Sequence, residues 1–338
     1  MKYSIYQLDF YNGVRFGKGR LETTEMTFHA DTLFAALFQE AIKLGKEKIF
    51  LDAVRNGVLR WSDAFPYKGR QLFLPKPMFQ PPVKETQEQG NSIRKKQFKN
   101  MKYVPIEYIK AYMKGEYPEK HLEDCKEIGK EGVKTAVAVR GHEDPEPYRV
   151  SAFYFNEGNG LYLILGSSGE AAEILFDDLM ESLSYSGLGG KKSAGLGRFE
   201  YVKKTVPDML GKALRSGSEG ASGHFGQSAS GEYAVLMSTA LPEEEKLKDV
   251  LTDASYSLLK RSGFVDSTTF DDQQMRKKDL YVLAAGSCMK HVFDGCMVEE
   301  KNGGRHPVYR YAYGLFLEVL TLLRKSMVCP ASPFSCGL

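Results

Sequence analysis

Two segments of this 338-residue chain carry apolar residues at helical spacing, and strand-like segments flank each of them. The first, "FHADTLFAALFQEAIKLG" at 28–45, predicts a helix with its apolar face at Leu33, Phe34, Leu37, Phe38, Ala41 and Ile42. Asp31 or Thr32 is the expected N-cap, and Gly45 stands where a C-cap glycine belongs. The second predicted helix spans 171–184.

The strand-like segments complete the pattern. Residues 3–10 and 198–203 predict single strands, and 149–165 predicts a hairpin that turns at Glu157–Gly160. Short strands interrupted by prolines are expected between 59 and 79, where one strand of the set is hard to place. The order strand, helix, strand, strand, helix, strand is that of a ferredoxin-like (RRM-like, βαββαβ) domain of the α+β class.

Changes in composition divide the rest of the chain. Residues 81–148 are polar and lysine-rich and predict an insertion outside the core of a first domain that spans 1–205. Residues 206–230 are rich in Gly, Ser and Ala and predict a flexible linker. Further strand-like segments at 231–324 predict a second α+β domain, and 325–338 form a tail without clear structure.

Composition excludes several classes of protein. A net charge of +3 is too small to indicate nucleic-acid binding without local clustering. The five cysteines form no CxxC pair, which argues against a zinc site or a disulfide framework, and no cofactor is expected. The sequence has no run of about 18 apolar residues, so we expect a cytoplasmic protein.

The stretch "YSGLGGKKSAGLGRFEY" at 185–201 is the clearest candidate for a phosphate-binding loop. It matches neither the Walker A pattern nor the dinucleotide pattern, and it leads from a helix to a strand. Its glycines allow backbone N–H groups to approach an anion, while Lys191, Lys192 and Arg198 add charge. The interpretation is a loop that grips a polyanion backbone, and the alternative is a plain turn with solvated lysines.

Four segments appear together in order: "FHADTLFAALFQEA", "SDAFPY…LFLPKPMF", "SGLGGKKSAGLGRFE" and "HPVYRYAYGLFLEV". With them the chain resembles the RAMP superfamily of CRISPR proteins, most closely the family of the fourth subunit of the Csm (type III-A) interference complex. The resemblance covers most of the chain but not the residues after about Leu323. The glycine-rich loop marks the superfamily, and the second segment together with the helix marks this subunit family.

The resemblance implies a non-catalytic RNA-binding subunit made of two ferredoxin-like domains. Such a subunit holds the 5′ handle of the CRISPR RNA and docks the large polymerase-like subunit and a backbone RAMP subunit. It also implies that the insertion acts as a thumb at the guide–target duplex and that the glycine-rich loop contacts RNA. The candidate RNA-binding residues are Gly187, Gly189, Gly190, Lys191, Lys192, Ser193, Gly195, Gly197, Arg198, Arg15, Lys18, Arg20, His29, Arg261, His306, Tyr309 and Arg310.

Two other functions stay open from the sequence. Related RAMP endoribonucleases that cut CRISPR repeats use a histidine near the first helix, so His29 could serve acid–base cleavage of RNA. No second catalytic group is marked, and a histidine that packs or touches RNA is the simpler interpretation. A stand-alone metabolic enzyme with a nucleotide-phosphate loop is the third possibility, and the failed loop patterns argue against it.

Overall fold

The structure, a computed structural model, describes residues 1–79, 92–138, 146–216, 233–267, 269–300 and 303–318. We call residues 1–205 the N-terminal unit and residues 206–318 the C-terminal unit. The elements of the N-terminal unit are β1 (Lys2–Phe10), β2 (Phe16–Gly17), β3 (Thr24–Glu25), α1 (Ala30–Lys43), α2 (Glu47–Arg55), β4 (Leu59–Trp61), β5 (Phe65–Lys68), β6 (Gln71–Pro75), α3 (Ser92–Asn100), β7 (Tyr103–Pro105), η1 (Ile106–Tyr108), α4 (Ile109–Met113), η2 (Glu119–His121), η3 (Asp124–Glu127), β8 (Gly129–Ala138), β9 (Glu146–Phe155), β10 (Asn159–Ser167), α5 (Glu170–Ser186), η4 (Lys192–Ala194) and β11 (Phe199–Thr205).

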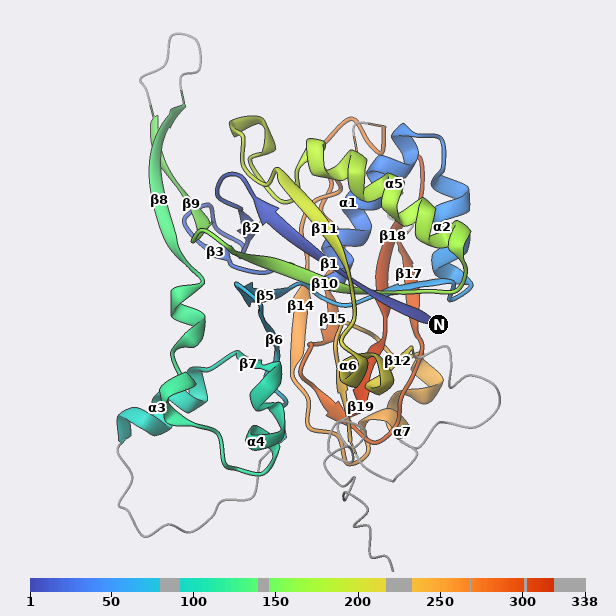
Figure 1. The fold of residues 1–338 in the computed structure, drawn as a ribbon. Coiled ribbons are helices and arrows are strands. Elements are labelled where there is room, and N and C mark those ends of the chain that lie inside the picture. The colour runs from blue at the N-terminus through green and yellow to red at the C-terminus, as the bar shows by residue number, and fades with distance from the viewer. Residues whose placement is uncertain (80–91, 139–145, 217–232, 268, 301–302, 319–338) are drawn as a thin grey trace, which may run out of the picture.

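The main sheet of the N-terminal unit has the strand order β11-β1-β10-β5-β6-β7, and β4 also pairs with β10 (Figure 1). Strand β1 is antiparallel to both β10 and β11, with Ile5 opposite Ile164 and Lys204. Helices α1 and α5 pack together on one side of this sheet. The predicted helices and the strands at 3–10 and 198–203 are therefore confirmed.

Strand β10 is buried on both faces, and its alternate residues enter two different cores. Leu161, Leu163 and Leu165 face the helices α1 and α5. Tyr162 and Ile164 face a second core, shared with the C-terminal unit. This double burial explains why its sequence, LYLIL, is almost continuously apolar.

The strand that was hard to place is β4 followed by β5, and both pair with β10. The chain leaves the sheet between them at Ser62–Ala64, where Asp63 N–H donates to the Met237 carbonyl of the C-terminal unit. The sequence did not show one continuous strand here, because residues 62–64 leave the sheet to contact the C-terminal unit.

The C-terminal unit is built mainly from strands. Its elements are α6 (Asp208–Ala213), β12 (Leu214–Ser216), β13 (Ala234–Leu236), η6 (Glu244–Lys246), α7 (Leu247–Leu251), β14 (Leu258–Arg261), β15 (Leu280–Leu283), β16 (Cys288–Met289), β17 (Gly295–Glu300), β18 (Val308–Tyr313) and β19 (Leu315–Glu318). Four strands form a sheet of order β12-β19-β13-β16, while β14-β15 and β17-β18 form separate two-stranded ribbons.

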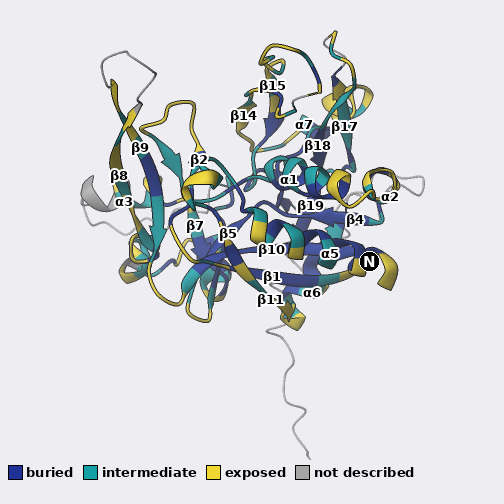
Figure 2. Cartoon of the chain, turned by 90° about the horizontal axis from the view of Figure 1, so that it is seen from above, coloured by how far each residue is buried: buried dark blue, intermediate teal, exposed yellow. Residues whose placement is uncertain are grey.

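The two units share their cores. Trp61 of β4 stacks on Tyr311 of β18 with ring centroids 4.4 Å apart, and both side chains are fully buried. On the other side of the main sheet, Ile164 packs in one cluster with Leu315 and Leu317 of β19. In Figure 2 the strands β10 and β19, one from each unit, are both coloured as buried. No helix within the described ranges combines the length and apolar composition needed to cross a lipid bilayer.

Three expectations about connections are wrong. Strand β9 pairs with β8 rather than with β10, so 149–165 is not a paired hairpin, and β8–β9 instead projects from the body (Figure 1). The insertion is partly core, because Val104, Ile109 and Tyr112 are buried. The flexible linker predicted from 206 is helix and strand at 208–216, where Leu210 and Leu214 are buried. Residues 217–230 and the tail at 325–338 lie outside the described residues.

Candidate nucleic-acid interface

The glycine-rich loop joins α5 to β11 through a backbone path that few side chains tolerate. Gly187, Gly189, Gly195 and Gly197 have φ between +80° and +96°, and Lys191 has φ +62°. A Cβ on Gly189 would lie 2.6 Å from the carbonyl O of Arg15, and one on Gly197 would overlap the carbonyl of Leu188. Glycine is thus needed both for the left-handed conformation and for close packing of the loop.

Backbone hydrogen bonds fasten this loop to residues 13–15. Gly190 N–H donates to the Arg15 carbonyl (2.8 Å), and Gly197 N–H donates to the Gly13 carbonyl (3.1 Å). Val14 in turn exchanges two backbone hydrogen bonds with Phe153 of β9. Three segments that are distant in the sequence therefore meet at one surface: residues 11–20, residues 187–198 and the β8–β9 hairpin. We call this the glycine-loop surface.

Fewer backbone N–H groups of the loop glycines are available to bind an anion than the sequence predicts. The N–H groups of Gly187, Gly190, Gly195 and Gly197 already donate to carbonyl groups of the protein. They cannot at the same time bind an anion, so most of the expected anion nest is not free. The cations and hydroxyls of the loop carry the remaining capacity for phosphate.

The cations of the glycine-loop surface are placed by different means. Lys191 Nζ lies 5.0 Å from the ring centroid of Tyr148 on β9, and Arg15 donates to the Arg20 carbonyl at 2.9 Å. Lys18 pairs with Glu25 at 2.8 Å. Ser193 and Arg198 are exposed and Lys192 is partly exposed. The structure thus brings together the predicted residues of both loops.

A hollow beside the loop adds residues that the sequence did not single out. Its volume is about 460 Å³, and Tyr11, Asn12, Tyr185 and Arg198 are among its lining residues. Tyr11 is 63% exposed and Tyr185 is 73% exposed, while the Tyr11 hydroxyl donates to Glu200. Exposed aromatic rings beside an arginine can stack on nucleobases. Only the density of tyrosines near basic loops hinted at them in the sequence.

His29 lies apart from the glycine-loop surface, at the start of α1. Its Nδ1 is 2.7 Å from Oδ2 of the buried Asp63, whose Oδ1 accepts the N–H groups of Ala30 and Thr239 at 2.8 Å each. Asp63 therefore ties together α1, the β4–β5 junction and the C-terminal unit. The expected N-caps are wrong, since Asp63 satisfies the helix start while Asp31 lies inside the helix. The expected C-cap glycine is confirmed, because Gly45 has φ +64° and its N–H donates to the Ile42 carbonyl.

Asp31 instead holds Arg261 of β14. Arg261 donates through Nε (2.7 Å) and a terminal nitrogen (2.8 Å) to the two carboxylate oxygens. Burial alone would raise the pKa of Asp31, but the guanidinium outweighs it and lowers the pKa below its usual value. Arg261 is thus committed to this bidentate pair between the two units.

The three remaining predicted residues are also engaged within the protein. Arg310 is 6% exposed and donates to Glu300 at 2.7 Å and to the carbonyls of Lys278 and Arg261. His306 contacts Ser267 through Nε2 at 2.9 Å, and Tyr309 packs edge-on against Phe38. These residues do not join the glycine-loop surface.

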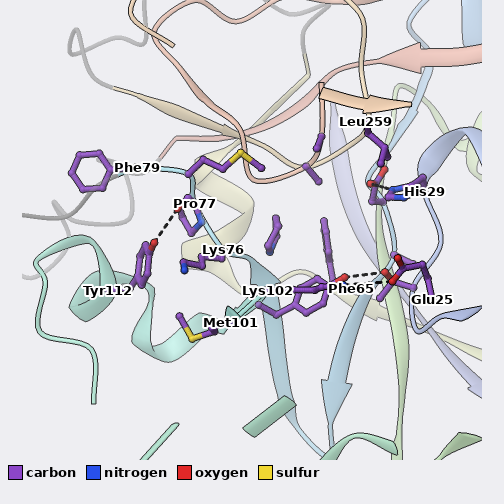
Figure 3. Close-up of a pocket in the computed structure, with 18 of the residues that line it drawn as sticks. Glu25, His29, Phe65, Lys76, Pro77, Phe79, Met101, Lys102, Tyr112 and Leu259 are labelled. Carbon is purple, nitrogen blue, oxygen red and sulfur yellow. Dashed lines mark hydrogen bonds and ion pairs between the residues drawn. The ribbon is translucent and has the colours of Figure 1, made fainter. Parts of the chain in front are cut away.

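A larger cavity of about 710 Å³ opens next to His29 (Figure 3). It is lined by residues of the N-terminal unit, of the insertion and of the C-terminal unit, among them Glu25, Lys76, Met101, Lys102 and Leu259. Burial lowers the pKa of Lys76 below its usual value. The segment "SDAFPY…LFLPKPMF" supplies a large share of the walls.

Comparison with known proteins decides the family. A protein described as "CRISPR system Cms protein Csm4" from Mycobacterium tuberculosis is 32% identical over 320 residues, covering 94% of this chain and 98% of the relative. The chain belongs to the Csm4 family. A Csm4 protein from Streptococcus thermophilus is likewise 32% identical, over 329 residues and 94% of this chain. The family model for the CRISPR Csm4 C-terminal domain matches residues 229–319. The resemblance found in the sequence is thereby confirmed.

Solved structures of complexes that contain Csm4 include chains of similar fold. A chain of a Csm3–Csm4 subcomplex of the type III-A CRISPR–Cas interference complex matches with a TM-score of 0.60 at 17% identity, covering 94% of this chain and 99% of the other. A Csm1–Csm4 cassette in complex with pppApA matches with a TM-score of 0.58 at 19% identity, covering 94% and 97%. The mixed fold of helices and strands expected from the sequence is thus confirmed at this level.

Proposed function

We propose that this Csm4 protein is a non-catalytic RNA-binding subunit of a type III-A CRISPR effector and that its glycine-loop surface holds the 5′ handle of the CRISPR RNA. The convergence of residues 11–20, 187–198 and β8–β9 supports this most strongly, because it gathers cations from two distant loops and places the Tyr148 ring of β9 beside Lys191. Lysine and arginine grip phosphates without reading sequence, and Tyr11 and Tyr185 offer stacking surfaces for bases.

The proposal includes two protein partners. Relatives of known structure form a Csm3–Csm4 subcomplex and a Csm1–Csm4 cassette. We infer that this chain docks the corresponding backbone subunit and large polymerase-like subunit. A cytoplasmic location, expected from the sequence, stays a prediction.

We also infer that the N-terminal unit is ferredoxin-like. The order β11-β1-β10-β4/β5, all antiparallel, is the order that a βαββαβ chain produces in its sheet. The C-terminal unit fits this description less well, since α6 and α7 are the α-helices among its described residues and each has at most 6 residues. The projecting β8–β9 hairpin is the proposed thumb at the guide–target duplex, where Lys134 lies 5.6 Å from the Tyr154 ring centroid.

Cleavage of RNA by His29 is the rival function, and the His29–Asp63 contact is the observation that favours it. We prefer a structural role, because the same carboxylate also holds two backbone N–H groups across the units. The variant His29→Ala distinguishes them on labelled CRISPR-repeat RNA. Cleavage by the wild type that is lost in the variant would establish the enzyme.

The binding function is tested by replacing Lys191, Lys192 and Arg198 together with alanine in the full chain. Fluorescence anisotropy with a labelled single-stranded handle RNA should show weaker binding and a slope of log K against log salt that is shallower by about 2. The matched control replaces the exposed Lys48, Lys212 and Lys248, which lie on α2, α6 and α7. Equal binding by the two triple variants would refute the role of the surface.

A further inference from the structure

The large cavity beside His29 has the size and composition of a ligand site. Its volume of about 710 Å³ lies within the usual range for small-molecule pockets. It forms where five parts of the chain meet: residues 25–29, residues 63–65, the end of β6 with residues 76–79, the insertion from Phe98 to Tyr112, and Leu259 with residues 284–285 of the C-terminal unit.

The walls of this cavity are apolar and partly aromatic. Met78, Phe79 and Met101 line it, and Phe98 is backed by Tyr112 with ring centroids 5.7 Å apart and nearly parallel planes. The backing fixes the position of the Phe98 ring. Flat apolar surfaces of this kind, with polarizable sulfur beside them, suit an aromatic ring system that enters from solvent.

Three lysines add positive charge to the same cavity. Lys76 Nζ lies 4.6 Å from the Phe98 ring centroid and also donates to the Phe98 carbonyl. Lys99 and Lys102 line the cavity and are exposed. The facing carboxylate, Glu25, is neutralised by Lys18 at 2.8 Å and Lys102 at 3.5 Å.

The polar edge of the cavity can bind the edge of a base. His29 uses Nδ1 toward Asp63 and lines the cavity, so its second ring nitrogen remains for a ligand. Thr27 and Tyr103 exchange a hydroxyl hydrogen bond at 2.9 Å in the same wall. A planar ring with polar edges and an attached anion is the chemistry of a nucleotide.

We propose that this cavity is a pocket for an unpaired nucleotide, with its base between the apolar walls and its phosphate at the lysines. The inference rests on the proposed RNA-binding function. Lys18 belongs to the glycine-loop surface and pairs with Glu25 of the cavity, so the two regions are in direct contact. A strand of RNA on that surface reaches the pocket, which makes single-stranded RNA the source of the nucleotide.

The test blocks the pocket without changing charge. Leu259→Trp fills it from β14, and Ala285→Phe fills it from the residues after β15. Ile49→Trp on α2, where the side chain is 63% exposed, is the bulky control. Each full-length variant is measured by anisotropy with a labelled oligouridylate and with an abasic oligomer of the same length, and circular dichroism verifies folding.

Filling the pocket should weaken binding of the oligouridylate about tenfold and leave the abasic oligomer unchanged, because only the base enters. The charge variant of Lys191, Lys192 and Arg198 should weaken both oligomers, so failure of the pocket is distinguished from failure of the surface. Unchanged oligouridylate binding by both filled variants would overturn the pocket. Binding of AMP alone as tightly as the oligomer would overturn RNA as the source.

Discussion

The variant Gly197→Ala tests why the glycine-rich loop at 187–198 needs its glycines. Gly197 has φ +80°, and an added Cβ would lie well under 3.0 Å from the backbone of Leu188, whose N–H donates to the Gly197 carbonyl at 2.9 Å. Gly19 provides the matched control, since its φ is +89° but no atom lies within 4 Å of an added Cβ.

The expected costs follow from these two environments. The left-handed backbone costs either alanine about 1 kcal/mol, and the gain from a less flexible unfolded chain is common to both. Overpacking adds about 1–3 kcal/mol at Gly197 alone. The free energies of unfolding of the two variants should therefore differ by about 2 kcal/mol. At about 2.1 cal/mol/K of unfolding entropy per residue, this difference lowers the Tm of Gly197→Ala by about 3 °C relative to Gly19→Ala.

Thermal unfolding followed by circular dichroism measures this difference directly. The same samples should show weaker RNA binding for Gly197→Ala, because the loop must open between Gly197 and Leu188 to admit the Cβ. Equal Tm values for the two alanine variants would refute the argument that close packing selects glycine in this loop.

Two further predictions concern contacts between the units. Because Arg261 lowers the pKa of Asp31 in the folded state, the pair stabilises the protein above the unfolded pKa of about 3.9 and the stabilisation is lost as pH falls. Asp31→Asn should therefore lower the free energy of unfolding by about 2 kcal/mol at neutral pH and by less in acid. Urea unfolding at several pH values measures this, and a difference between wild type and variant that widens in acid would contradict the prediction. Tyr311→Phe removes the hydroxyl that accepts the backbone N–H of Trp61 at 3.2 Å, and this should lower the free energy of unfolding by about 1–2 kcal/mol. Unfolding can be followed by the fluorescence of Trp61, the sole tryptophan of the chain, and an unchanged unfolding midpoint would contradict the prediction.

Local patterns in the sequence predicted the elements whose burial is simple. Helices α1 and α5 each bury one face, so their periodicity is visible, and β1 and β11 have clear ends. Strand β10 is apolar on both faces, so its sequence carries no information about its neighbours. Its pairing with β1 and β5 rather than β9 depends on tertiary contacts.

The candidate site was predictable in its loops and less so in its distant residues. The glycines and cations of 187–198 and the cations of 15–20 were each singled out in the sequence, and the structure places them together. Arg261 and Arg310 were expected to contact RNA, but partners as far away in sequence as Asp31 hold them inside the protein. Such pairs leave no local signal, because the Arg261–Asp31 pair depends on how the two units pack and the Arg310–Glu300 pair depends on how β17 and β18 pair.

The most direct measurement maps where single-stranded RNA contacts the full chain. Handle RNA that carries 4-thiouridine is crosslinked to the protein by ultraviolet light, and the modified peptides are identified by mass spectrometry. Crosslinks should concentrate in residues 11–20 and 185–198, with β8–β9 beside them. Crosslinks confined to α2, α7 and the β17–β18 ribbon, with none in the glycine-rich loop, would contradict the account.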